Sequence, residues 1–141
     1  MRTNEEAARQ ILHGAALLAT RARAERAGKI TLSQTGVLRH LAHSGALTPG
    51  ELAERLRTQP QSLSRAFAAL EDQDWIRRRP DPADGRQSLL EITPAGTEVL
   101  AAEMRPRELW LAGALESLTE AERDFLVVAA GLLERLATEE Y

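Results

Sequence analysis

The chain has no cysteine, which excludes a disulfide framework and thiol-based redox sensing and fits the reducing cytoplasm. Aromatic residues make up only 4% of its 141 residues, so a core must consist mainly of aliphatic side chains. The longest apolar run, residues 125–133, is too short to cross a bilayer. Glu5 and Glu6 lie where a signal peptide would carry positive charge, so we expect no signal peptide. We expect one cytoplasmic domain without membrane contact.

Sequence motifs for catalysis are also missing. The chain has no glycine-flanked nucleophile and no glycine loop for phosphate. His40 and His43 are three residues apart and share a helix face, but no cysteine or acidic residue accompanies them on that helix, so we expect no zinc site. We therefore expect neither an enzyme nor a cofactor.

Acidic charge slightly exceeds basic charge overall, with a net charge of −3. The distribution is uneven, because residues 1–87 carry a net charge of +4 and residues 88–141 a net charge of −7. Binding to phosphate is a local matter, so the basic part can bind nucleic acid while the acidic part points away.

Residues 48–75 contain two short segments with helical periodicity. Thr48 and Glu51 form a capping box for the first segment, and Thr58 is a candidate cap for the second, before Pro60 in its first turn. The inward positions are Leu52, Ala53, Leu56, Leu63, Phe67 and Leu70. The opposite face of the second segment carries Gln59, Gln61, Ser62, Ser64, Arg65 and Ala68. Such a small, polar face can offer donors to base edges, although a solvated surface is an equally good interpretation of it alone.

A β-hairpin follows, with strands predicted over residues 76–79 and 88–92. The turn formers between them place Arg86 at the tip, where its guanidinium can enter a minor groove. Asp84 is expected to hold Arg86, or one arginine of residues 77–79, by an ion pair. Trp75 is expected to pack between the second helix and the hairpin. Two helices and a hairpin predict a winged helix-turn-helix, within a mainly α fold.

Long apolar helices are predicted at both ends of the chain. Capping boxes at Thr3–Glu6 and Thr119–Glu122 begin the first and last of them, and Gly28 is expected to end the first. One subunit has little to cover these helices, so we expect a homodimer. The expected organisation is an N-terminal dimerisation helix (1–31), a DNA-binding module (32–93) and C-terminal dimerisation helices (94–141).

The order of the elements and several motifs resemble the MarR (multiple antibiotic resistance regulator) family of bacterial transcription regulators. The matching residues are Leu63-Ser64-Arg65, Leu70, Trp75-Ile76, Arg78 and Arg79, Pro80-Asp81-Pro82, Asp84-x-Arg86 and Thr93-x-x-Gly96. Asp74 departs from the pattern, because the family usually has glycine at the end of the recognition helix.

The resemblance implies a two-fold dimer, most often a repressor, that binds double-stranded DNA at an inverted repeat with half-sites about 10 bp apart. The candidate DNA contacts are Gln59, Gln61, Ser62, Ser64, Arg65, Arg78, Asp84 and Arg86. The family often binds a small aromatic or phenolic anion, for which the candidates by position are His13, Leu17, Arg21, His40 and Trp110. The alternative that the acidic net charge favours is a winged-helix dimer for protein contacts, without DNA binding.

Overall fold

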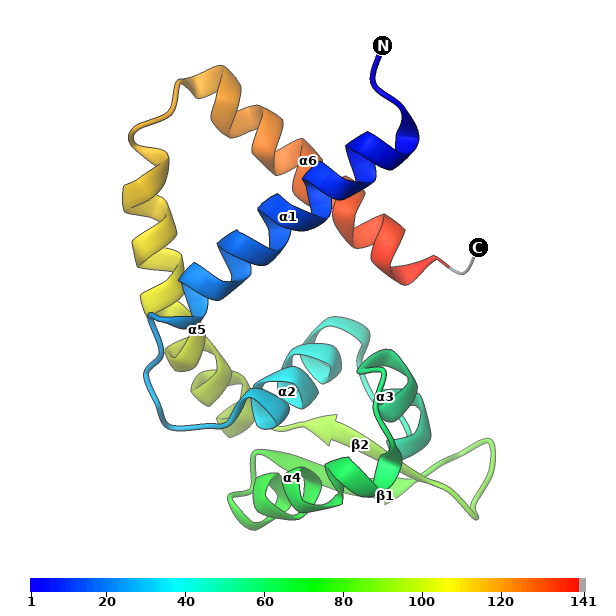
Figure 1. Cartoon of the computed structure of the whole chain (residues 1–141). Helices are drawn as coiled ribbons and strands as arrows, with labels where there is room; N and C mark the ends of the chain where they lie inside the picture. Colours follow the sequence, from blue (N-terminus) through cyan, green and yellow to red (C-terminus); the bar gives the residue numbers. More distant parts are fainter. Residues whose placement is uncertain (140–141) are drawn as a thin grey trace. The chain divides into compact units, whose positions relative to one another are not determined.

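The computed structural model describes residues 1–139, which form six helices and one two-stranded sheet. In chain order the elements are α1 (Asn4–Arg23), α2 (Leu32–Ser44), α3 (Pro49–Arg55), α4 (Pro60–Asp72), β1 (Ile76–Pro80), β2 (Ser88–Ile92), α5 (Pro94–Leu115) and α6 (Glu120–Thr138) (Figure 1). This is the mainly helical arrangement with one β-hairpin that the sequence predicts.

The elements form two compact units. The winged unit comprises Arg26–Pro106, and the terminal-helix unit comprises Met1–Glu25 and the chain from Arg107 onward. The winged unit is longer than the predicted module 32–93. It extends in both directions because Ile30 is buried in its core, and Val99 and Leu100 of α5 pack against that core.

The core of the winged unit is formed by side chains on one side of each of its elements. Val37, Leu38 and Leu41 of α2 are at most 1% exposed. The remaining core members from α3, α4 and the hairpin are Leu52, Ala53, Leu63, Phe67, Leu70, Ile76 and Leu90. Burial of a leucine or phenylalanine side chain contributes about 1.5–3 kcal/mol. The buried side chains of α4 therefore hold this helix against the core, and its opposite side remains exposed.

The two strands pair antiparallel, with Ile76 opposite Ile92 and Pro80 opposite Ser88. Leu90 also forms a bridge with Leu47, in which the N–H of each residue donates to the carbonyl of the other at 3.0 and 2.8 Å. This bridge ties the base of the hairpin to the segment before α3. The loop between the strands is the part of the hairpin that projects from the helices of the winged unit (Figure 1).

The starts of α1, α3 and α6 follow the predicted caps. The capping boxes at Thr3, Thr48 and Thr119 are present, and Thr31 with Gln34 forms another that was not predicted. The predicted end of the first helix at Gly28 is wrong, because α1 ends at Arg23. There the N–H groups of Ala24 and Glu25 bond to carbonyls three residues earlier, which tightens the last turn before the glycine is reached.

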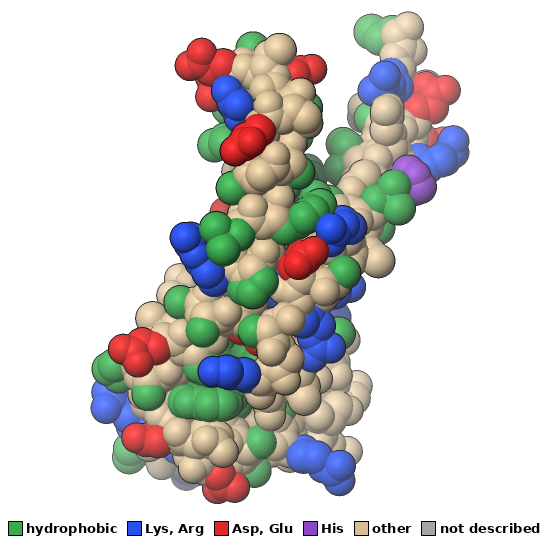
Figure 2. Space-filling view, turned by 90° about the vertical axis from the view of Figure 1, so that its left-hand side faces the viewer, with side chains coloured by type: hydrophobic (Ala, Val, Ile, Leu, Met, Phe, Trp, Pro, Cys, Tyr) green, Lys and Arg blue, Asp and Glu red, His purple; other side chains and the backbone are tan. Residues whose placement is uncertain are grey.

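The helices of the terminal-helix unit bury little within one chain. Neither α1 nor α6 has a buried residue. Their exposed large apolar side chains are Ile11, Leu12, Leu17, Leu18, Phe125, Leu126, Val127, Val128, Leu132, Leu133 and Leu136. Figure 2 shows hydrophobic side chains on the outer surface of the long helices. Even so, no helix within residues 1–139 has both the length and the apolar character needed to cross a membrane.

Candidate nucleic-acid interface

The outward side of α4 consists of small and polar residues. The exposed members are Gln59 at the N-cap, Gln61, Ser62, Ser64, Arg65 and Ala68. The Ser64 hydroxyl donates to the Pro60 carbonyl at 3.3 Å. Within residues 1–139, the side chains of Gln61, Ser62 and Arg65 form no hydrogen bond or ion pair. Their donors are therefore available to a partner outside the chain, as base-edge contact requires.

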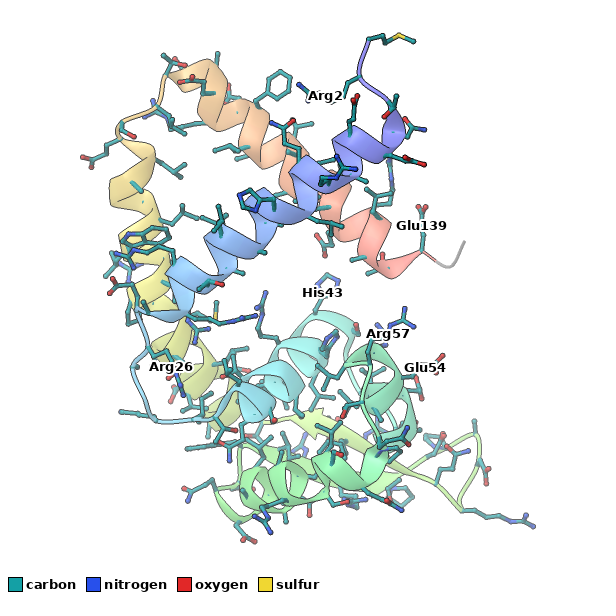
Figure 3. All side chains as sticks on the ribbon, viewed as in Figure 1. Arg2, Arg26, His43, Glu54, Arg57 and Glu139 are labelled. Carbon is teal, nitrogen blue, oxygen red and sulfur yellow. The ribbon has the colours of Figure 1, made fainter. Side chains whose placement is uncertain are left out.

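The turn between α3 and α4 differs from the prediction at Thr58. The N-cap of α4 is Gln59, which makes no side-chain capping bond, and Pro60 occupies the first turn as expected. Arg57 adopts a left-handed conformation with φ 52°, and the N–H of Thr58 bonds to the Ala53 carbonyl at 2.9 Å. This bond folds Thr58 back onto α3, one residue before the cap position. The Arg57 side chain lies at the outer edge of the winged unit (Figure 3).

The three consecutive arginines of β1 point alternately to the two sides of the hairpin, as strand geometry requires. Arg78 faces α4, where its Nε and Nη2 both donate to Glu71 Oε1 at 3.1 and 2.8 Å. This ion pair joins the wing to α4. It borders an open hollow of about 240 Å³ that Ser64 and Phe67 of α4 also line.

Arg77 and Arg79 lie on the other side of the hairpin and share one acceptor. Arg77 Nε donates to Glu91 Oε1 at 2.6 Å, and Arg79 Nε donates to Glu91 Oε2 at 3.2 Å. The hydrogen bonds from Arg77 and Arg79 lower the pKa of Glu91 below its usual value. Glu91 is therefore ionised at neutral pH and neutralises part of the charge of β1.

The wing loop is shaped by two aspartates. Asp81 accepts a hydrogen bond from the Ala83 N–H at 2.9 Å, and Asp84 accepts one from the Arg86 N–H at 3.1 Å. The predicted ion pair of Asp84 with a wing arginine is wrong. The Asp84 carboxylate accepts instead from the Arg86 backbone and from the Gln87 side chain at 3.3 Å, which fixes the turn. Arg86 is exposed, and its guanidinium has no partner within residues 1–139.

The end of α4 is joined to the start of α5 by Thr93. Its N–H donates to the Trp75 carbonyl at 3.0 Å, and its hydroxyl donates to the Asp74 carbonyl at 2.6 Å and accepts from the Gly96 N–H at 3.0 Å. A Cβ on Gly96 would lie 2.0 Å from the Trp75 carbonyl oxygen, so only glycine fits there. Asp74 takes a left-handed conformation with φ 59°, which aspartate tolerates better than most residues. The motif Thr93-x-x-Gly96 thus holds this turn, and Trp75 packs against the core as predicted.

The residues predicted to bind a small ligand are divided between the two units. His13 and Leu17 are exposed on α1, and the Arg21 guanidinium lies 4.4 Å from the centroid of the Trp110 ring, all within the terminal-helix unit. Arg21 also pairs with Glu25 at 3.0 Å. His40 lies in the winged unit, half-buried on α2.

Burial lowers the pKa of His40, and the positive charges of Arg55 and Arg39 and a smaller contribution from His43 lower it further. His40 is therefore neutral at pH 7. Within residues 1–139, no three side chains of His, Asp or Glu are grouped so as to hold a metal ion. The winged unit thus presents exposed donors on α4 and the exposed guanidinium of Arg86 on the wing loop.

Comparison with known proteins agrees with this geometry. The family model described as MarR family matches residues 29–87, which contain α2, α3, α4 and most of the wing. The chain is 44% identical to an uncharacterized HTH-type transcriptional regulator of Mycobacterium bovis over 110 residues, covering 78% of this chain and 77% of that protein. It is 36% identical to the multiple antibiotic resistance protein MarR of Salmonella typhimurium over 70 residues, covering 50% of this chain and 49% of that protein.

Solved structures extend the similarity to the terminal helices. A MarR family protein from Bacillus stearothermophilus superimposes with a TM-score of 0.78 at 22% identity, covering 98% of this chain and 100% of that chain, which shows the shared fold. The Mycobacterium bovis relative is named as an HTH-type transcriptional regulator. The winged helix-turn-helix, the family model and these relatives together show that the chain belongs to the MarR family of transcriptional regulators.

Proposed function

We propose that the protein is a homodimeric, ligand-responsive repressor that binds an inverted-repeat operator in duplex DNA. The observation that carries this proposal is the winged unit itself. It presents an exposed polar side of α4 next to a projecting loop on which Arg86 has no partner within residues 1–139. A regulator of this kind works where the bacterial chromosome lies, so we infer a cytoplasmic location.

In this proposal α4 enters a major groove. Gln61, Ser62 and Arg65 contact base edges, because their donors lie on the outward side of the helix without a partner in the described chain. Gln59 lies at the start of α4, the end from which recognition helices contact bases. Ser64 and Arg78 contact phosphate or support the wing, since Arg78 already links the hairpin to α4 through Glu71.

The wing is proposed to enter the adjacent minor groove with Arg86 leading. A narrow minor groove concentrates negative potential and attracts an inserted arginine. Asp84 acts on this contact through the backbone, because its carboxylate fixes the turn at the Arg86 N–H. The guanidinium then remains available to DNA.

The dimer is proposed to form through α1 and α6. Both helices leave large apolar side chains exposed in a single chain, and soluble proteins rarely expose large apolar patches that have no partner. A specific interface buries about 800 Å² per subunit. Two-fold symmetry then requires an inverted repeat, with half-sites about 10 bp apart on one face of the duplex.

A small aromatic or phenolic anion is the proposed effector, with Arg21 and Trp110 as its first contacts. The guanidinium supplies positive charge and the ring supplies a stacking surface, 4.4 Å apart. His13 and Leu17 lie on the same helix as Arg21. The role of His40 in effector binding stays a prediction from family resemblance. An effector acts only by its differential affinity for two states of the protein.

The test begins with selection of bound sequences from random duplexes, from which we expect a palindrome. Arg86→Ala should then weaken binding to that sequence by about 1–3 kcal/mol and leave the dimer intact. Arg105→Ala is the matched control, because it makes the same charge change at an exposed position of α5, outside the proposed DNA contacts and outside the two helices proposed to form the dimer. Equal binding by the two variants in gel-shift titrations would refute the role of the wing. Absence of duplex binding at low salt would favour the protein-contact alternative.

A further inference from the structure

The outer side of the hairpin carries a compact group of charges that the proposed contacts do not use. Arg77 lies directly opposite Glu91 in the strand register, and Arg79 lies diagonally across from it. The two Nε atoms donate to different oxygens of the same carboxylate, at 2.6 and 3.2 Å. The side chains of Arg77 and Arg79 are 63% and 42% exposed, so they remain within reach of a large partner.

Every arginine of β1 is therefore held by a glutamate, whereas Arg86 in the same hairpin is not. Arg78 is held by Glu71 of α4, and Arg77 and Arg79 are held by Glu91 of β2. A carboxylate accepts the same charge-assisted hydrogen bonds from guanidinium that a DNA phosphate accepts. Glu91 thus occupies two arginines in the way that a DNA backbone would occupy them.

We propose that Glu91 restrains the affinity of this protein for DNA of any sequence by holding Arg77 and Arg79 away from phosphate. The inference rests on the proposed function, because it concerns the same DNA-binding unit. Phosphate contacts from arginine and lysine supply essentially all sequence-independent affinity. The carboxylate removes two such contacts, and its own negative charge repels an approaching DNA backbone.

The restraint favours the operator over other DNA. Base contacts by α4 fix the position of the hairpin in an operator complex. A complex without base contacts has no fixed position, so the protein can shift until Arg77 and Arg79, once released, reach phosphates. Release of the two arginines therefore strengthens non-operator binding more than operator binding.

Glu91→Gln tests the inference, because it keeps the side-chain shape and removes the charge. Binding to a random-sequence duplex, measured by fluorescence anisotropy over a range of salt concentrations, should strengthen about three- to tenfold at low salt. The slope of log K against log salt should steepen by about 0.9 for each arginine that gains a phosphate contact. A fourfold reduction in salt then strengthens binding by the variant about tenfold more than binding by the unaltered protein.

Two further variants separate this effect from a change in net charge. Glu98→Gln removes an exposed glutamate of α5 that has no ion pair within residues 1–139, and it should leave the slope unchanged. Adding R77Q and R79Q to E91Q should cancel the gain. The double variant R77Q/R79Q leaves the Glu91 charge without its partners and should weaken random-duplex binding, but by less than the same two changes weaken binding by E91Q, because in E91Q both arginines contact phosphate.

The outcomes distinguish this inference from the proposed function. Binding by the unaltered protein, together with unchanged or weaker binding by E91Q, overturns the role of Glu91 alone. A loss from R77Q/R79Q that is as large in the unaltered protein as in E91Q overturns it as well, and E91A takes the place of E91Q in this comparison when E91Q does not fold. No duplex binding by the unaltered protein at low salt overturns the proposed function, and this inference with it.

Discussion

The two compact units differ in where their aliphatic side chains lie. In the winged unit, Leu38, Leu52, Leu70 and Leu90 are fully buried in one continuous core. In the terminal-helix unit, α1 and α6 bury no residue at all, and Phe125 is 79% exposed. Both units contain well-capped helices, so the difference lies in packing and not in helix formation.

This difference shows which interactions each unit depends on. The winged unit is stabilised by contacts within one chain, so we expect its stability to be independent of protein concentration. Most of the stability of a protein helix comes from packing of its apolar side, and α1 and α6 obtain little of it within one chain. We infer that their stability depends on a second copy and therefore on concentration.

The largest effect is expected from a variant that breaks the proposed dimer. Leu132 lies on the same side of α6 as Phe125 and Val128, which follow the spacing of an apolar stripe. Leu132→Glu would place an unpaired carboxylate in the interface twice, once from each subunit, at a cost of several kcal/mol per charge. Analytical ultracentrifugation should show a monomer at micromolar concentration.

Thr138→Glu provides the control for that variant. Position 138 is about 240° around the helix from position 132, at about 100° per residue, and Thr138 is exposed in the single chain on the same side of α6 as Glu134. The same charge there should leave the dimer intact. Dissociation by both variants, or by neither, would contradict an interface on the Phe125 side of α6.

The next largest effect concerns the core of the winged unit. Leu38 is fully buried, and Leu38→Ala should lower the free energy of unfolding by about 2–5 kcal/mol through lost burial and a cavity. Leu38→Met conserves volume and should cost less than about 1.5 kcal/mol. Thermal melts at several protein concentrations should show the same loss for Leu38→Ala each time. A loss that disappears at high concentration would contradict an independent core in this unit.

Local features of the fold could be predicted from the sequence. The strands were predicted over residues 76–79 and 88–92 and extend over Ile76–Pro80 and Ser88–Ile92, because turn residues bound them closely. The buried side of α4 was predicted from the spacing of Leu63, Phe67 and Leu70, since each residue turns the helix by a fixed angle.

Features that depend on distant residues could not be predicted in the same way. The bridge between Leu47 and Leu90, and the ion pair between Arg78 and Glu71, join residues whose proximity follows only from the complete fold. Asp84 was expected to hold an arginine because opposite charges lie nearby in the sequence. The turn instead brings the Arg86 N–H to the carboxylate first.

The candidate DNA-binding site also has features that follow from the local sequence and features that depend on distant residues. Exposure of the outward residues of α4 follows from burial of the opposite side, so the surface itself was predictable. Which of those side chains contact bases stays a prediction, because the contact depends on DNA. Glu91 has no local signal in the sequence, and only the strand register brings it to Arg77.

The smallest expected effect is a change in the pKa of one glutamate in each unit. Hydrogen bonds from Arg77 and Arg79 lower the pKa of Glu91, and the backbone N–H and then the hydroxyl of Thr119 lower the pKa of Glu122. A carboxyl group with a lowered pKa in the folded state stabilises the fold fully above its usual pKa of 4.5. That contribution is lost as the pH falls through the lowered pKa.

NMR titration of the carboxyl groups checks both causes. In R77Q/R79Q the pKa of Glu91 should return to its usual value, while that of Glu122 stays low. In Thr119→Ala the pKa of Glu122 should rise only partly, because the N–H of residue 119 still donates to its carboxylate, at 2.8 Å in the unaltered chain. A pKa of Glu91 that stays low without both arginines would contradict the pairing across the hairpin, and with it the restraint on DNA binding proposed for Glu91.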